Sequence, residues 1–194
     1  SLLKELCLEI EDRVCPIENK TCINEGNAIA MAIGYHLSTK KIAAIYLQNS
    51  GLGNCVNPLV SLASSEIYSI PMLLIIGWRG HHSEKDEPQH ILQGKITTSM
   101  LDVMGISYDI LDKDTIDAEM RLEKLVKQAQ ASNSPVALLV RRGVFEKGKI
   151  NKQSNKKICF MREKAIEVVV DNLPRESFVI ATTGMASREL YEVR

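Results

Sequence analysis

Residues 19–35 read NKTCINEGNAIAMAIGY, and this stretch decides the fold class. It passes from a short strand-like segment into a small, apolar, Ala-rich helix, with one carboxylate, Glu25, at the junction and Gly26 directly after it. An acid at a helix start is common because anions suit the positive end of the helix dipole. Open α/β folds, however, bind ligands at the carboxyl edge of a parallel sheet, where such a residue would lie. Glu25 is therefore either a helix-start charge or a functional carboxylate at that edge.

The rest of the first 140 residues alternates short apolar runs with helical patterns. Strands are expected at 20–24, 41–47, 71–77, 106–111 and 135–140, and helices at 2–12, 25–38, 55–68, 94–104 and 114–131. The near-continuous apolar runs at 41–47 and 71–77 are typical of strands buried on both faces of a parallel sheet. This alternation predicts an α/β fold, an open parallel sheet flanked by helices. In the last of these helices five residues are expected to face inward: Ile116, Met120, Leu125, Val126 and Ala129.

The composition and periodicity of the sequence change after residue 140. Residues 141–160 carry seven Lys or Arg residues against the single acid Glu146, and glycines break any periodicity. A helix at 161–172, a strand at 177–181 and a further helix after Met185 follow, and these elements cannot bury a core alone. We expect a first domain at 1–140, a basic linker at 141–160, and at 161–194 the incomplete beginning of a second, similar α/β domain.

Composition excludes several classes of function. The 194 residues hold 24 basic and 24 acidic side chains, so the balance favours neither a nucleic acid nor a membrane as partner. The five cysteines are scattered and include no CxxC pair, which is typical of reduced cytoplasmic thiols and not of a disulfide frame or zinc site. The apolar runs fall short of the roughly 20 residues that a membrane-spanning helix needs.

Three polar loops follow the three clearest strands and should meet at one edge of the sheet. They are Asn24–Gly26, Gln48–Asn54 and Gly77–Gln93. The second is neither a P-loop nor a dinucleotide GxGxxG turn. Each of the residues singled out here has two interpretations. Gln48, Asn49 and Ser50 are either turn formers or ligand contacts. His90 is either a surface imidazole or an acid/base group, and Trp78 is either a core residue or part of the site. The irregular spacing of His81, His82, Glu84 and Asp86 argues against a metal site.

Several strings in these loops resemble a known family. The order NEGNAIAMAIGY (24–35), NSGLGN (49–54) and IPMLLIIG (70–77) looks like the pyrimidine-binding domain of thiamine-diphosphate enzymes. Within that superfamily, YLQNSGLGN (46–54), GWRG (77–80), KDEPQH (85–90) and ATTGMASRELY (181–191) resemble the phosphonopyruvate decarboxylase family. The resemblance covers essentially the whole chain. It departs from the family pattern at residues 81–83, which read His-His-Ser where relatives commonly read Glu-Pro-Gly.

The resemblance implies the roles of particular residues. Glu25 would hydrogen-bond N1′ of the aminopyrimidine of thiamine diphosphate, which prepares the cofactor to lose its thiazolium C2 proton. The small residues after Glu25 would let the flat ring approach. The cofactor-binding residues implied are Asn24, Glu25, Gly26, Gln48, Asn49, Ser50 and Gly51, and the substrate-side candidates are Trp78, Arg79 and His90. The ligands of the diphosphate and of Mg²⁺ are expected in a half that this chain lacks.

The resemblance also implies an activity and an assembly. It implies decarboxylation of 3-phosphonopyruvate to phosphonoacetaldehyde and CO2 by a homodimer or higher oligomer, with the site between subunits, so these residues alone should be inactive. One alternative is a sulfopyruvate decarboxylase or another 2-oxoacid decarboxylase. Another is a non-catalytic α/β binding partner, against which Glu25 counts, because such a module has no use for a carboxylate there.

Overall fold

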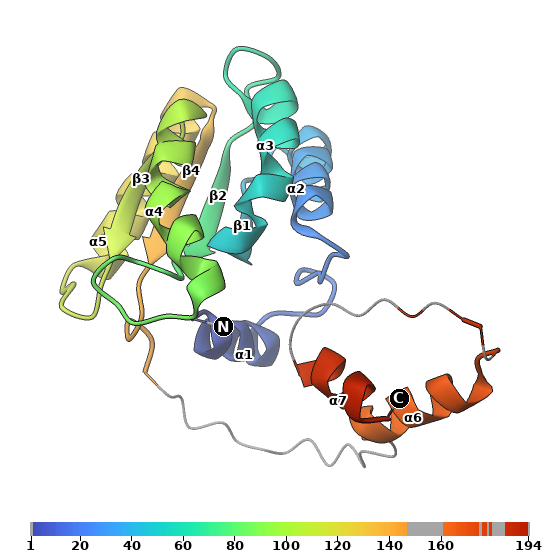
Figure 1. The fold of residues 1–194 in the computed structure, drawn as a ribbon. Coiled ribbons are helices and arrows are strands. Elements are labelled where there is room, and N and C mark those ends of the chain that lie inside the picture. The colour runs from blue at the N-terminus through green and yellow to red at the C-terminus, as the bar shows by residue number, and fades with distance from the viewer. Residues whose placement is uncertain (1, 147–160, 175, 178, 180–184, 194) are drawn as a thin grey trace. The chain divides into compact units, whose positions relative to one another are not determined.

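The chain forms two compact units, Ser1–Ile150 and Asn151–Arg194. The computed structural model describes residues 2–146, 161–174, 176, 177, 179 and 185–193 (Figure 1). In the described residues no helix is long and apolar enough to cross a membrane.

A four-stranded sheet forms the centre of the first unit. Its strands are β1 (Ala43–Gln48), β2 (Met72–Gly77), β3 (Ser107–Leu111) and β4 (Pro135–Val140), and every neighbouring pair is parallel in the order β1-β2-β4-β3. Gln48 pairs with Gly77, Gly77 with Val140, and Val140 with Leu111. The carboxyl ends of all four strands therefore lie level at one edge, and the expected open parallel α/β sheet is confirmed.

Helices cover the two faces of this sheet. One apolar core joins the sheet to α2 (Glu25–Thr39), α3 (Leu52–Pro58), the π-helical turn η2 (Leu59–Ala63) and α4 (Pro88–Val103). A second core joins it to α5 (Ala118–Ser132) and to α1 (Lys4–Arg13) with the preceding Leu3. β2 and β4 are central strands and are almost entirely buried, which accounts for their unbroken apolar sequences. Figure 1 shows α2 and α3 beside β1, and α4 and α5 on opposite sides of β3 and β4.

The structure corrects the expected strand at 20–24. These residues form no strand, and β1 is the edge of the sheet on that side. The residue before the segment meets β1 through its side chain, since the Tyr46 hydroxyl donates to the Asn19 side-chain oxygen at 2.8 Å, whereas Ile23 within the segment is 95% exposed. A strand needs a paired backbone, and this short segment has neither a ladder partner nor an apolar face against the core.

Helix boundaries also differ from expectation. The helix expected at 55–68 begins at Leu52, directly after a 3-10 turn at Asn49–Gly51, and its π-helical continuation ends at Ala63. The helix expected at 94–104 begins six residues earlier, at Pro88, because proline has its fixed φ suited to a first helical turn. The inward orientation of Ile116 and Met120 was wrong. Ile116 is 100% exposed because it precedes α5, which starts only at Ala118, and Met120 is 69% exposed because it lies on the side of α5 opposite the buried Leu125 and Ala129.

The second unit contains two described helices, α6 (Arg162–Asn172) and α7 (Met185–Val193). The Arg162 guanidinium donates two hydrogen bonds of 2.6 Å to the Glu189 carboxylate, which joins α6 to α7. Most of the expected linker, residues 147–160, lies outside the described residues. So do three of the five residues of the expected strand at 177–181 and the Thr182–Gly184 segment.

Candidate functional site

Glu25 is the first residue of α2, and the chain before it fixes where that helix begins. Asn24 is the N-cap, with extended backbone, and its side-chain oxygen accepts a hydrogen bond of 2.9 Å from the Asn27 backbone N–H. This is the usual way to satisfy a free donor at a helix start. Asn24 therefore acts as a cap here, and it points the half-buried Glu25 side chain toward the loop that follows β1.

The Glu25 carboxylate is held from two sides. Oε2 accepts a hydrogen bond of 2.9 Å from the side-chain amide of Asn54, in the first turn of α3. Oε1 lies so close to Gly51 that a Cβ there would come within 2.3 Å of it. A Cβ on Gly26 would likewise lie 2.9 Å from the Asn54 carbonyl oxygen. Both glycines are therefore required by close approach: Gly51 admits the carboxylate, and Gly26 lets α2 and α3 touch.

Cys55 is a buried thiol beside this carboxylate. Burial, followed by the nearby charge of Glu25, raises the pKa of the Cys55 thiol to about 12. The thiol donates to the Gly51 carbonyl at 3.5 Å. At neutral pH Cys55 is a protonated, unreactive core residue that presents no competing charge to Glu25.

Asn49 uses its side chain entirely within the protein. Its side chain is fully buried, and its amide donates to the Arg79 carbonyl and to the Thr97 hydroxyl, each at 2.9 Å. Its side-chain oxygen accepts from the Arg79 N–H at 3.1 Å, while Gln93 donates to its main-chain carbonyl at 3.0 Å. Asn49 thus ties together the loop after β1, the loop after β2 and α4.

Gln48 and Ser50 flank Asn49 and have accessible side chains. The Gln48 amide donates to the Ser50 hydroxyl at 2.7 Å, a local contact across the start of the turn. Ser50 is exposed and Gln48 half-buried. These two side chains can exchange their mutual hydrogen bond for one to a ligand at the carboxyl edge, which Asn49 cannot do without breaking the loop.

Trp78 and Arg79, the first residues after β2, are both engaged within the protein. The Trp78 indole N–H donates to the Gly94 carbonyl at 2.9 Å, and its ring is 7% exposed. Arg79 forms a two-pronged ion pair with Asp86, which also accepts from the Gly80 N–H at 2.9 Å. The hydrogen bonds from Arg79 hold the pKa of Asp86 well below its usual range.

Two histidines of the loop after β2 and of α4 differ in their surroundings. The ring of His81 packs edge-on against Trp78 with centroids 4.6 Å apart, and burial, Arg141 and His82 together lower the pKa of His81. His90 is half-buried in the first turn of α4, and no hydrogen bond to its ring is formed among the described residues. His90 is therefore the substrate-side candidate whose ring nitrogens are not used elsewhere in the described part of the chain.

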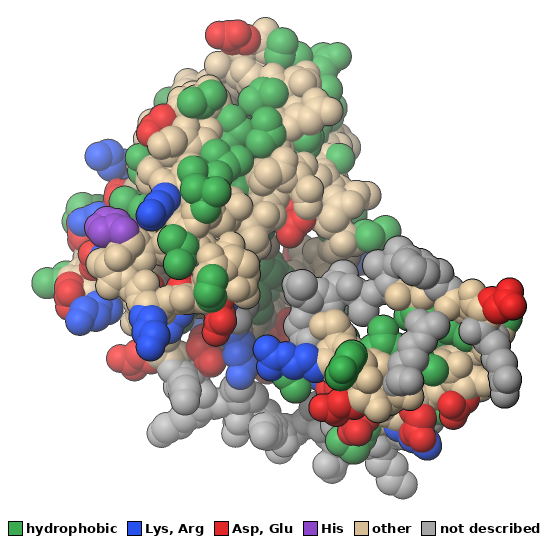
Figure 2. All heavy atoms as spheres, in the orientation of Figure 1, with side chains coloured by type: hydrophobic (Ala, Val, Ile, Leu, Met, Phe, Trp, Pro, Cys, Tyr) green, Lys and Arg blue, Asp and Glu red, His purple; other side chains and the backbone are tan. Residues whose placement is uncertain are grey.

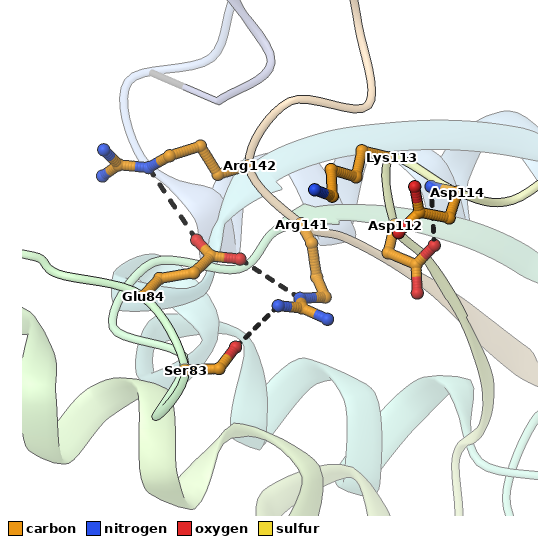
Figure 3. Close-up of a pocket in the computed structure, with 7 residues that line it drawn as sticks. All are labelled: Ser83, Glu84, Asp112, Lys113, Asp114, Arg141 and Arg142. Atoms are coloured by element: carbon orange, nitrogen blue, oxygen red, sulfur yellow. Dashed lines mark hydrogen bonds and ion pairs between the residues drawn. The ribbon is translucent and has the colours of Figure 1, made fainter.

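A pocket of about 280 Å³ opens at the carboxyl ends of β3 and β4 (Figure 3). Its lining carries three basic and three acidic side chains in addition to Ser83: Lys113, Arg141, Arg142, Glu84, Asp112 and Asp114. Glu84 accepts from Arg141 at 3.1 Å and lies 3.8 Å from the Arg142 guanidinium, so both arginines are paired with one carboxylate. This cluster holds the loop after β2 against the end of β4, and its balanced charge does not recommend it for an anionic ligand.

The structure thus divides the sequence-predicted residues into two groups. Gly26 and Gly51 lie beside the Glu25 carboxylate. Trp78, Arg79 and the Asn49 side chain instead form hydrogen bonds within the protein that hold the loops after β1 and β2 and helix α4 together. Sequence reasoning missed Asn54, because nothing in its local sequence shows that it reaches Glu25, 29 positions earlier. It missed Asp86 as the partner of Arg79 for the same reason.

Part of the site suits the pyrimidine of thiamine diphosphate. One Glu25 oxygen is held by Asn54, while Oε1 accepts no hydrogen bond from the described residues and remains for a ring nitrogen. The side chains next to it on α2 are small, which leaves room for a flat ring. For a metal the fit is different: the described residues contain no group of three or more His, Cys, Asp or Glu side chains that could hold an ion.

Comparison with known proteins gives consistent matches. The profile of the family "Thiamine pyrophosphate enzyme, N-terminal TPP binding domain" matches residues 1–103. The chain is 33% identical over 186 residues to a phosphonopyruvate decarboxylase of Streptomyces viridochromogenes, a match that covers 88% of this chain and 46% of that protein. A phosphonopyruvate decarboxylase of Streptomyces hygroscopicus is 34% identical over 187 residues, again 88% and 46%.

A shorter relative matches over most of its own length. Sulfopyruvate decarboxylase subunit alpha of Methanothermobacter thermautotrophicus is 32% identical over 133 residues, which is 69% of this chain and 78% of that subunit. By contrast, the chain spans about half the length of the phosphonopyruvate decarboxylases that it matches.

Proposed function

The chain belongs to the thiamine pyrophosphate enzymes, as their N-terminal TPP binding domain, and from this premise we propose that it is the pyrimidine-binding part of a thiamine-diphosphate-dependent 2-oxoacid decarboxylase. The observation that carries the proposal is the Glu25 carboxylate, oriented by Asn54 against Gly51 with one oxygen open. When bound, thiamine diphosphate supplies the carbanion and the electron sink for loss of CO2. The protein supplies position and electrostatics.

In this proposal Glu25 holds or shares a proton with the pyrimidine nitrogen. Gly51 and Gly26 keep the space around the carboxylate free of side chains, and Asn24 fixes the helix start from which Glu25 projects. Gln48 and Ser50 contact the ligand beside it. Asn49 contributes by locking the two loops together, because its own side chain is buried and fully paired.

We propose 3-phosphonopyruvate as substrate, with phosphonoacetaldehyde and CO2 as products. The support is the pair of phosphonopyruvate decarboxylases matched over 88% of the chain. Sulfopyruvate is the second candidate, supported by the relative named sulfopyruvate decarboxylase subunit alpha, which matches over 78% of its own length. Trp78, Arg79 and His90 are the proposed substrate-side residues. Of these, Arg79 can reach an acidic substrate only by giving up Asp86, whereas His90 has its ring nitrogens available within the described residues.

Domain organisation and assembly belong to the same proposal. Residues 1–140 are the pyrimidine-binding domain, 141–160 a basic linker and 161–194 the start of a diphosphate-binding domain, with Mg²⁺ ligands outside this chain. We propose a homodimer or larger assembly that completes the site between subunits. Its support is the exposed apolar surface of the first unit, which Figure 2 shows as green patches on the face in view. Helix α4 alone exposes Ile91, Leu92, Ile96 and Val103.

The test is turnover by the full-length protein with thiamine diphosphate and Mg²⁺. Phosphorus NMR follows phosphonopyruvate, CO2 release follows sulfopyruvate and pyruvate, and Glu25→Gln is assayed in parallel. Cofactor-dependent formation of phosphonoacetaldehyde that is lost in Glu25→Gln is the expected result. Turnover of sulfopyruvate alone would change the substrate and keep the chemistry. Failure to decarboxylate any 2-oxoacid would refute the enzyme and favour a non-catalytic binding partner.

A further inference from the structure

Asn54 makes one side-chain hydrogen bond among the described residues, and its partner is the carboxylate at the centre of the site. The amide nitrogen donates to Glu25 Oε2 at 2.9 Å, from α3 to the first residue of α2. Asn54 is exposed, so burial does not force its amide to find a protein partner. A surface amide can donate to water instead. The hydrogen bond from Asn54 to Glu25 therefore forms because the backbone holds the two side chains next to each other.

Two features of the chain fix that backbone position. The Asn54 carbonyl oxygen packs against Gly26, where a Cβ would come within 2.9 Å. This carbonyl also lacks the usual helical donor, because residue 58, four positions later, is a proline without an N–H. The first turn of α3 is thus seated directly on the start of α2, with Asn54 and Glu25 facing each other.

The contact divides the two carboxylate oxygens between different tasks. Oε2 is held by the amide, whereas Oε1 lies against Gly51 and accepts no hydrogen bond from the described part of the chain. A carboxylate on a flexible glutamate side chain has several rotamers, and one donor at a fixed place selects among them. The amide is a neutral donor, so it adds no charge that would compete for a ligand.

We propose that Asn54 is a positioning residue: it holds Glu25 so that Oε1, and not Oε2, faces the ligand. That the ligand is the pyrimidine of thiamine diphosphate rests on the proposed function above. Asn54 itself does not touch the reacting atoms. It acts through Glu25, and it sets the direction of the carboxylate.

Asn57, one turn further along α3, provides a matched control. It is exposed, and no hydrogen bond to its side chain is formed among the described residues. Asn54→Ala removes the donor, and Asn54→Asp replaces it with a second carboxylate of the same shape. Asn57→Ala and Asn57→Asp make the same changes in composition and charge on the same helix without touching Glu25.

The experiment uses full-length protein and two readouts. Decarboxylation is measured as kcat and KM across pH, and calorimetry gives the affinity for thiamine diphosphate with Mg²⁺ across pH. In Asn54→Ala, kcat should fall by about tenfold to a hundredfold, the effect of losing a hydrogen bond to a charged group. In Asn54→Asp the acidic limb of both pH profiles should move upward by roughly one unit, because two adjacent carboxylates retain a proton at higher pH. The Asn57 variants should match the wild type in both readouts.

The outcomes separate this inference from the proposed function. If the wild type decarboxylates a 2-oxoacid but the Asn54 variants behave like the Asn57 variants, the positioning role is refuted and the function stands. If no 2-oxoacid is decarboxylated, the function is refuted, and the pH dependence of cofactor affinity in Asn54→Asp still decides the inference. Absence of cofactor binding by the wild type would overturn both.

Discussion

Gly51→Ala should abolish most activity and leave the fold intact. The Gly51 backbone has φ −83° and ψ −9°, which alanine adopts without strain. Its Cβ, however, would lie 2.3 Å from Glu25 Oε1 and 2.3 Å from the carboxylate carbon, where ordinary contacts begin at 3.4 Å. The carboxylate must therefore retreat by about 1 Å. Glu25 Cγ would also lie 2.4 Å from this Cβ, so the outer part of the side chain has to turn away together, which its rotatable bonds allow without a backbone shift.

The size of the effect follows from that displacement. A misplacement of about 1 Å in a catalytic group costs on the order of 100-fold in rate, which corresponds to about 2.7 kcal/mol of transition-state stabilisation. The free energy of unfolding should change by less than about 2 kcal/mol, because the lost Asn54 hydrogen bond is offset by the lower chain entropy of alanine in the unfolded state.

Gly53→Ala is the matched control, two residues further along. A Cβ on Gly53 meets nothing within 4 Å, so this variant should keep wild-type kcat and gain up to about 1 kcal/mol in unfolding free energy. Both variants are compared in full-length protein by 2-oxoacid turnover and by chemical denaturation. Equal kcat for the two would refute the placement of Glu25 against Gly51. Unfolding of Gly51→Ala would show that the carboxylate is not free to yield.

Three further predictions concern stability and accessibility. Asp86→Asn leaves Arg79 without its charged partner and should lower the free energy of unfolding by about 3 kcal/mol near pH 7. The pKa of Asp86 is lowered in the folded state, so the wild type should keep this difference in full above about pH 4 and lose it as the pH falls further. Chemical denaturation of both proteins across pH measures the difference. Gly34→Ala, in the interior of α2 with nothing within 4 Å, should raise the free energy of unfolding by about 0.5–1 kcal/mol; a loss in denaturation would show a hidden contact. In alkylation followed by mass spectrometry, the exposed Cys15 should react first and Cys55 only after unfolding; early labelling of Cys55 would contradict its burial.

The sheet could be predicted from the sequence because its central strands are buried on both faces. A short, unbroken apolar run between polar turns is typical of such a strand, and the bounds of β4, Pro135–Val140, are those expected. The segment at 20–24 had no such signal beyond its position before a helix, and it lies outside the sheet edge. The periodicity at 114–131 misplaced Ile116 because pattern alone does not show where a helix starts, and it misplaced Met120 because that residue lies opposite the buried Leu125 and Ala129 on α5.

The site was only partly predictable, for a physical reason. Glu25 was recognisable because a lone charge in an apolar, small-residue segment is costly unless it has a partner or a ligand. The partners of that charge lie on other elements, and contacts such as Asn54 to Glu25 or Asn49 to Thr97 depend on how helices and loops pack. Local sequence identifies a polar residue after a strand. Local sequence does not show whether the side chain of that residue faces a ligand or forms hydrogen bonds inside the protein.

The inward use of Arg79 bears on how an acidic substrate could be recognised. A phosphonate or sulfonate at this arginine would have to replace Asp86, a carboxylate whose side chain is 3% exposed and which also accepts from the Gly80 N–H. That exchange would release the loop at 80–87 from two of its anchors. Arg141 and Arg142 share the single carboxylate of Glu84, and Arg142 also lies 3.8 Å from Asp86. The three arginines at this edge are thus paired with carboxylates of the loop after β2, whereas Lys113 forms no ion pair among the described residues. To bind directly at Arg79 or Arg141, an acidic 2-oxoacid would have to displace Asp86 or Glu84, whereas the Glu25 carboxylate has Oε1 free of hydrogen bonds from the described residues.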